Sequence, residues 1–82
     1  MLATVASITT ANRLKRCAAR EGINATVIQT PASLTKEGCG YSLRFADSAK
    51  SIVIACAREA DVKIKAFFIE TEHDGKKSYQ KL

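Results

Sequence analysis

The side chains best suited to nucleophilic chemistry in this sequence are its three cysteines, Cys17, Cys39 and Cys56. Cys39 differs from the others because it lies between Gly38 and Gly40, directly before an alternating apolar run. Flanking glycines leave a sulfur uncovered and permit backbone angles that turn successive N–H groups towards an anion such as a thiolate or persulfide. A lone G-C-G is a weak motif, so an incidental cysteine in a turn is an equally good interpretation at this point.

Charges near Cys39 in the sequence favour its thiolate only in part. Lys36 and Arg44 would stabilise the anion, whereas Glu37 would oppose it. The other two cysteines are predicted to be packing residues. Cys56 falls in the middle of an apolar helical stripe and Cys17 at the edge of another, where cysteine behaves as a small hydrophobic residue.

Other kinds of site are not supported. The sequence has no C-x-x-C pair, and its single histidine, His73, lies in a polar segment near the C-terminus, so no metal site is predicted. The same isolation of His73 argues against Cys–His catalysis. A chain of 82 residues also has little room for an enclosed cleft. We therefore expect a protein that is not an enzyme and needs no cofactor.

Hydrophobic periodicity predicts the order β-α-β-β-α-β. Pro31 closes the second strand, and residues 31–40 form a loop that leads into the third strand, "YSLRF". Right-handed crossovers then place both helices on one face, giving an α+β, ferredoxin-like sandwich with a four-stranded antiparallel sheet. The domain is predicted to span residues 1–70, with residues 71–82 as a polar tail. The expected strands are 2–7, 24–30, 41–45 and 62–71. The first expected helix is 10–21, and the second is capped by Asp47 or Ser48 and extends to Ala60.

The face of the sheet away from the helices is a candidate dimer interface. If the alternation in "VKIKAFFIET" directs Phe68 towards the helices, Phe67 and Ile69 point the other way and form an apolar patch with Ile28. A homodimer packed sheet to sheet would cover that patch. A register shift at a bulge would bury Phe67 instead.

The net charge of +5 is consistent with an acidic partner such as nucleic acid, but the basic residues are scattered, which is typical of a solvated surface. RNA-recognition modules of this topology stack bases on aromatic side chains, and the first strand, "LATVAS", has none. Nucleic-acid binding is therefore not favoured. The longest apolar run, "SIVIACA", is too short to cross a membrane, and the N-terminus lacks the basic flank of a signal peptide, so we expect a cytoplasmic protein.

Taken in order, "VASITTAN", a helix and "VIQTPASLTKEGCGYSLRF" resemble the selenium/sulfur carrier protein-like domain, a small bacterial family, over about residues 3–70. The family pattern has F-x-S-T-x-x-A before the first helix, then roughly I-P-x-P-R, a short loop and C-G. Ser7 and Ala11 match the first motif, Pro31 matches the second proline, and Cys39 with Gly40 matches the C-G pair.

The chain departs from this pattern at four positions. An aromatic residue, a threonine, the first proline and the arginine are replaced here by Val5, Ile8, Gln29 and Ala32. If the arginine helps to hold an anionic sulfur or selenium species, Lys36 or Arg44 would have to take its place.

The resemblance implies a carrier in which Cys39 takes sulfur or selenium from a donor resembling a cysteine desulfurase. The cysteine would hold it as a persulfide or perselenide for an acceptor protein. Gly38 and Gly40 would give access, and Lys36 and Arg44 would favour the anion. The sequence does not separate sulfur from selenium. A nucleic-acid-binding module, or a regulatory protein-interaction module without thiol chemistry, is the alternative.

Overall fold

Antiparallel strands form one five-stranded sheet in the computed structural model, which describes residues 1–34 and 40–82. The strand order across the sheet is β2-β3-β1-β4-β5. Two helices, α1 (Ile8–Arg20) and α2 (Lys50–Glu59), and two short 3₁₀ turns, η1 (Ala32–Leu34) and η2 (Asp47–Ala49), complete the described chain. The strands are β1 (Leu2–Val5), β2 (Thr26–Gln29), β3 (Tyr41–Arg44), β4 (Ala66–His73) and β5 (Lys76–Lys81).

The predicted four-stranded sheet is wrong, although the protein is α+β. The additional strand is β5, which pairs with the second half of β4 from Phe68 opposite Lys81 to His73 opposite Lys76. Asp74 and Gly75 join the two strands with φ angles of 52° and 78°. A two-residue turn with positive φ at both positions matches the twist of paired strands, and Asp-Gly is a preferred sequence for it.

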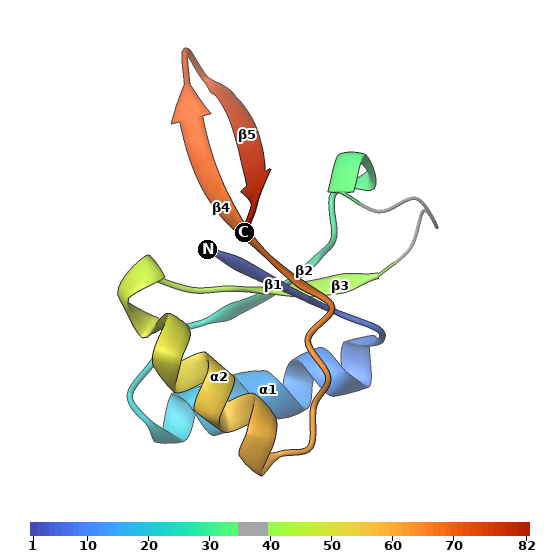
Figure 1. The fold of residues 1–82 in the computed structure, drawn as a ribbon, viewed down its shortest axis with the longest axis vertical. Helices are drawn as coiled ribbons and strands as arrows, with labels where there is room; N and C mark the ends of the chain where they lie inside the picture. Colours follow the sequence, from blue (N-terminus) through green and yellow to red (C-terminus); the bar gives the residue numbers. More distant parts are fainter. Residues whose placement is uncertain (35–39) are drawn as a thin grey trace.

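Both helices cover the same face of the sheet, as Figure 1 shows. The helix α1 begins at Ile8, two residues earlier than predicted, because Ser7 caps it. The Ser7 Oγ accepts a hydrogen bond from the Thr10 N–H at 3.2 Å. The apolar stripe of α1 is buried as expected, and α2 buries Val53, Cys56 and Ala57 against it.

Cross-strand pairing identifies which side chains share a face of the sheet. Ala3 pairs with Leu43 and Phe67, and these residues belong to the core beneath the helices. The prediction that Phe67 points away from the helices is therefore wrong. The reason is that β4 begins at Ala66 rather than Val62, so the alternation read from residue 62 has the opposite phase.

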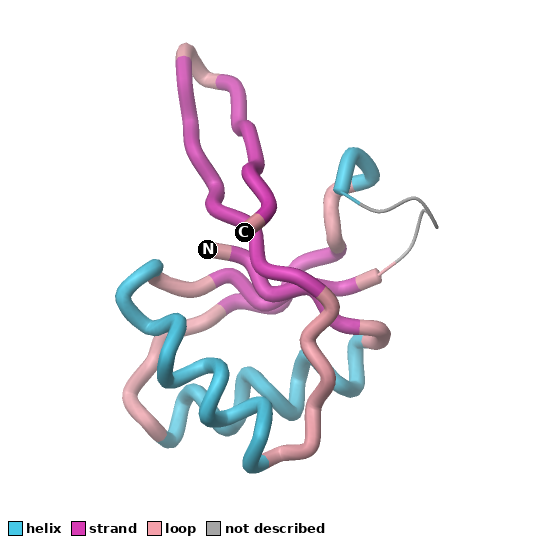
Figure 2. Tube along the Cα trace, in the orientation of Figure 1, coloured by secondary structure: helices cyan, strands magenta, loops and turns pink. Residues whose placement is uncertain are grey.

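The opposite face of the sheet is also largely buried. Leu2 and Ser42 have 0% of their surface exposed and Phe68 has 8%. The β4–β5 hairpin rises from the sheet on this side, away from the helices (Figures 1 and 2). In the described part of the chain, no helix is long and apolar enough to cross a membrane.

Candidate functional site

The structure describes three of the predicted site residues, Pro31, Gly40 and Arg44. Lys36, Gly38 and Cys39 lie outside the described residues. The described part of the candidate site therefore consists of the two segments that flank residues 35–39 and of the elements around those segments.

Hydrogen bonds between β2 and β3 hold these two ends together. The Thr30 N–H donates to the Gly40 carbonyl oxygen at 2.9 Å, and the Thr30 and Ser42 hydroxyls are 2.6 Å apart. Both side chains are buried, with 7% and 0% of their surface exposed. Thr30 and Ser42 thus form a buried polar contact at the base of residues 31–40, the segment that contains Cys39 and is called the cysteine loop below.

Gly40, next to this contact, has a backbone conformation that favours glycine. Its φ of 152° is rarely adopted by residues with a side chain, and a Cβ there would lie 3.7 Å from the Thr30 Oγ1 and 3.8 Å from the Val5 carbonyl oxygen. On the other strand, Pro31 follows β2, and its carbonyl oxygen accepts from the Leu34 N–H at 2.9 Å, which closes η1. The ring of Pro31 fixes φ at a value suited to such a turn.

Arg44 is bound elsewhere. Its Nη2 donates to the Glu70 Oε2 at 2.8 Å, and the Tyr79 hydroxyl donates to the same oxygen at 3.2 Å. The Lys77 Nζ is 3.8 Å from it. Burial alone would raise the pKa of Glu70, but the hydrogen bond and charge of Arg44, aided by Tyr79 and Lys77, outweigh it and lower that pKa.

Gly40 directly precedes β3, and Arg44 is its last residue. Four steps of about 3.3 Å per residue place their Cα atoms about 13 Å apart. The structure therefore places the charge of Arg44 against a carboxylate of β4 and does not bring it to the end of the sheet where Gly40 lies.

Sequence reasoning missed Glu70 and Tyr79 as partners of Arg44. Two signals could have found them. Asp74-Gly75 predicts a hairpin, and alternation along β4 then puts Glu70 on the same face as Phe68, across from Tyr79. The Thr30–Ser42 contact was missed because a serine on the face away from the helices was expected to be exposed.

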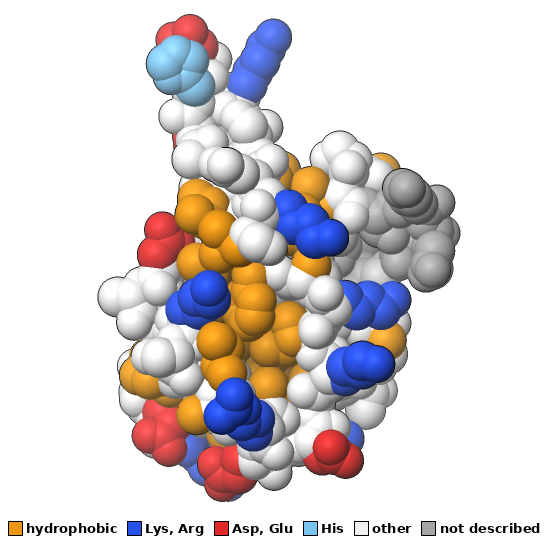
Figure 3. All heavy atoms as spheres, in the orientation of Figure 1, with side chains coloured by type: hydrophobic (Ala, Val, Ile, Leu, Met, Phe, Trp, Pro, Cys, Tyr) orange, Lys and Arg blue, Asp and Glu red, His pale blue; other side chains and the backbone are white. Residues whose placement is uncertain are grey.

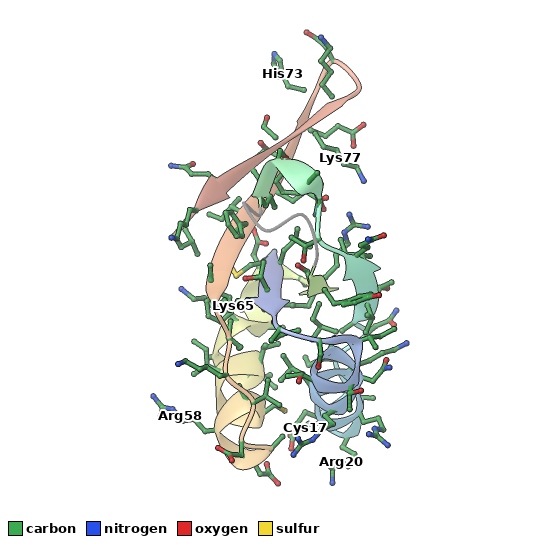
Figure 4. All side chains as sticks on the ribbon, turned by 90° about the vertical axis from the view of Figure 1, so that its right-hand side faces the viewer. Cys17, Arg20, Arg58, Lys65, His73 and Lys77 are labelled. Atoms are coloured by element: carbon green, nitrogen blue, oxygen red, sulfur yellow. The ribbon has the colours of Figure 1, made fainter. Side chains whose placement is uncertain are left out.

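Cys17 and Cys56 are free thiols buried between the two helices, each with 2% of its surface exposed. Figure 4 shows Cys17 in this position, facing α2. Burial raises the pKa of the Cys56 thiol to about 12, and a hydrogen bond with Cys17 adds to the effect. The Cys56 thiol is thus protonated at neutral pH, and both sulfurs are shielded from solvent.

The residues that match the first family motif have structural roles. Ser7 caps α1, and Ala11 is buried in the core. Since β1 ends at Val5, opposite Tyr41, the N-terminus of α1 is at the same end of the sheet as Gly40. The positive end of the helix dipole is therefore on the side of the molecule where the cysteine loop begins and ends.

A separate apolar strip bordered by Lys and Arg side chains is visible in Figure 3. It includes a hollow of about 650 Å³ between α2 and the start of β4, with Ile54, Ile64 and Phe67 in its lining. The Lys50 Nζ lies 5.3 Å from the centre of the Phe67 ring. None of the described residues that line this hollow is a cysteine, serine or histidine. No group of three or more metal-ligating side chains occurs within residues 1–34 and 40–82.

Comparison with known protein families gives a match over most of the chain. Residues 1–69 match the family model described as "Putative Se/S carrier protein-like". The matched segment includes the first motif, Pro31 and Cys39, and it ends within β4, so β5 lies beyond it. Neither a curated protein nor a solved structure matches the chain.

Proposed function

This chain belongs to the Se/S carrier protein-like family, and from that premise we propose that Cys39 carries sulfur or selenium as a persulfide or perselenide. The Cys39 thiolate attacks the outer sulfur of a donor persulfide. A sulfur–sulfur bond forms on Cys39, the sulfur–sulfur bond of the donor breaks, and the donor thiolate leaves with its electron pair. The transfer involves no net oxidation, and the protein acts as a carrier rather than as an enzyme.

The observation that carries this proposal is the burial of the other two thiols. Cys17 and Cys56 are both 2% exposed, and the pKa of Cys56 is about 12, so neither is suited to act as a nucleophile at neutral pH. Thiolate chemistry in this chain therefore falls to Cys39, the cysteine that matches the family pattern.

The surroundings of the loop support the proposal. The Thr30–Ser42 contact and the backbone bond from Thr30 to Gly40 fix the ends of the segment that contains Cys39. The N-terminus of α1 contributes positive potential at this end of the sheet. With Arg44 paired to Glu70 and Ala32 in place of the family arginine, Lys36 is the basic side chain that we assign to the thiolate. A free thiolate of this kind requires a reducing compartment, so we place the protein in the bacterial cytoplasm.

The test is transfer from a cysteine desulfurase supplied with cysteine, followed by mass spectrometry of the intact protein and its peptides. We expect one added sulfur on Cys39 in the wild-type protein and none there in Cys39→Ser. Cys17→Ala and Cys56→Ala are the matched controls and should keep the adduct. An unmodified wild-type protein, or an adduct that persists in Cys39→Ser, would refute the assignment. The same assay with a selenocysteine lyase and selenocysteine separates selenium from sulfur.

A further inference from the structure

The outer face of α1 is strongly basic. Arg13, Arg16 and Arg20 follow one another at intervals of three and four residues, which aligns them along one side of the helix. All three are exposed, and Figure 4 shows Arg20 directed away from the sheet at the C-terminal end of α1. Within the described residues, none of the three forms a salt bridge. Their charge is therefore available to a partner.

Two neighbouring hollows shape this surface. The first, of about 640 Å³, is lined by the three arginines together with Ala19 and Ala60. Arg13 is held in place by a 2.8 Å hydrogen bond from its Nη2 to the Ala60 carbonyl oxygen. The second hollow, of about 510 Å³, shares Arg16 and Ala19 with the first, and its remaining lining residues are Thr9, Asn12 and Lys15. No carboxylate is present among the described residues that line either hollow.

An exposed apolar side chain lies at the other end of the same helix. Ile8, the first residue of α1, has 48% of its surface exposed. It follows β1 by three residues, so it is at the end of the sheet where Val5 pairs with Tyr41 and where Gly40 precedes β3. From Ile8 to Arg20 the helix extends about 18 Å. The arginines thus begin at Arg13, more than one turn beyond Ile8, and continue away from this end of the sheet to Arg20.

We infer that the outer face of α1 is the docking surface for an acidic patch on the protein that donates sulfur to Cys39, a cysteine desulfurase; this inference rests on the proposed function. Carboxylates of the donor pair with the three arginines, and a small apolar side chain of the donor contacts the methyl groups of Ala19 and Ala60. Ile8 contacts the donor closest to the loop. Docking in this orientation places the active site of the donor at the end of the sheet where the described chain stops at Leu34 and resumes at Gly40, on either side of Cys39.

Two features favour a protein over a nucleic acid as the occupant. Ala19 and Ala60 line the first hollow together with the arginines, and Ile8 is exposed at the start of α1. This combination suits the mixed apolar and arginine-rich character of protein interfaces. The exposed face of α1 also has no aromatic side chain on which a base could stack.

The experiment measures binding of the full-length protein to a purified cysteine desulfurase and, separately, to a fluorescent 20-nucleotide RNA. Arg16→Glu/Arg20→Glu is compared with Lys76→Glu/Lys81→Glu, which changes the net charge equally on the exposed strand β5. We expect the α1 variant to bind the desulfurase at least tenfold more weakly and the β5 variant to change by less than threefold. Ile8→Ala should cost about fivefold. Thermal melting confirms that each variant is folded.

A second readout separates this inference from the proposed function. Inorganic polysulfide loads Cys39 without docking, so the α1 variant should gain sulfur from polysulfide at the wild-type rate and from the desulfurase more slowly. The docking inference is refuted if the two double variants lose binding equally, or if the wild-type protein does not bind the desulfurase. Either result refutes it even if polysulfide still modifies Cys39. Tighter binding of RNA, lost only in the α1 variant, assigns the surface to nucleic acid. Desulfurase binding that depends on α1, without any sulfur on Cys39, refutes the carrier function alone.

Discussion

The buried contact between Thr30 and Ser42 gives the most direct test of how the cysteine loop is held. Ser42→Ala removes one hydroxyl and leaves the Thr30 hydroxyl buried without that partner, 2.6 Å from where the Ser42 oxygen was. An unsatisfied buried hydroxyl costs about 1–3 kcal/mol, so we expect a loss of about 2 kcal/mol in the free energy of unfolding. For a domain of this size, that corresponds to a fall of roughly 10 °C in melting temperature.

The double variant tests the same reasoning more strictly. Thr30→Val alone leaves the Ser42 hydroxyl unpaired and should cost about as much as Ser42→Ala. Replacing both hydroxyls leaves no unpaired group. The loss in free energy of unfolding of the double variant should therefore be smaller than the sum of the two single losses, by at least about 1 kcal/mol.

Chemical denaturation of the four proteins provides these values, with Ser33→Ala as a control. Ser33 is an exposed residue of η1, so its replacement should change the stability by less than about 0.5 kcal/mol. Additive losses from Thr30→Val and Ser42→Ala, or single losses as small as that of Ser33→Ala, would refute a coupled buried contact at the base of the loop.

Three further predictions concern titration and backbone conformation. The pKa of Cys56 is raised from 9.0 to about 12, so the folded protein holds this proton more tightly than the unfolded chain. The free energy of unfolding should therefore fall by about 1 kcal/mol per pH unit above pH 9. Cys56→Ala should remove this contribution to the pH dependence in denaturation experiments. The pKa of Glu70 is lowered from 4.5, so its contribution to stability is present above pH 4.5 and is lost as the pH falls through its pKa in the folded protein. Glu70→Gln should lower the free energy of unfolding by about 0.5–1 kcal/mol at pH 7. A loss of the same size at pH 2 would contradict the ion pair with Arg44. Gly75→Ala, at a φ of 78° with no atom close to the added Cβ, should cost about 1 kcal/mol locally and speed amide exchange in β5 about fivefold, whereas unchanged exchange would argue against the turn.

The strongly periodic parts of the fold could be predicted from the sequence. Leu14 and its neighbours on α1 recur at helical spacing and are buried, and Cys56 lies in the stripe that α2 buries. The alternation of Leu43 in β3 and Phe45 directly after it likewise places both residues in the core. In each case one face of the element is apolar enough to fix its orientation without tertiary information.

The errors arise where polar or uniformly apolar residues carry little periodic signal. In "AFFI" every side chain is apolar, so the sequence alone could not decide whether Phe67 or Phe68 faces the helices, and the start of β4 at Ala66 sets the phase. The strand β5 contains three lysines and one tyrosine, which does not suggest a buried face. Only the Asp74-Gly75 turn indicated the hairpin.

In the candidate site, too, features that are local in sequence could be predicted and tertiary contacts could not. Cys39 stood out through its glycines and its match to the family pattern, both of which are local in sequence. The pairing of Arg44 with Glu70 joins β3 to β4, two strands that lie on either side of β1 in the sheet. The position of Ile8 at the same end of the sheet as Gly40 depends on the pairing of β1 with β3. Contacts of this kind are set by tertiary structure and could not be derived from spacing along the chain.

The central place of β1 in the sheet determines when this protein can fold. Leu2 pairs with Arg44 in β3 and with Phe68 in β4, so the strand that comes earliest in the chain has neighbours from the middle and the last third of it. Pairings between such distant segments form slowly, typically in milliseconds to seconds. During synthesis at about 5–20 residues per second, β1 remains without its β4 neighbour for several seconds. Folding is therefore completed late, and until Phe68 has been added, one edge of a strand that becomes fully buried is open to other unfolded chains.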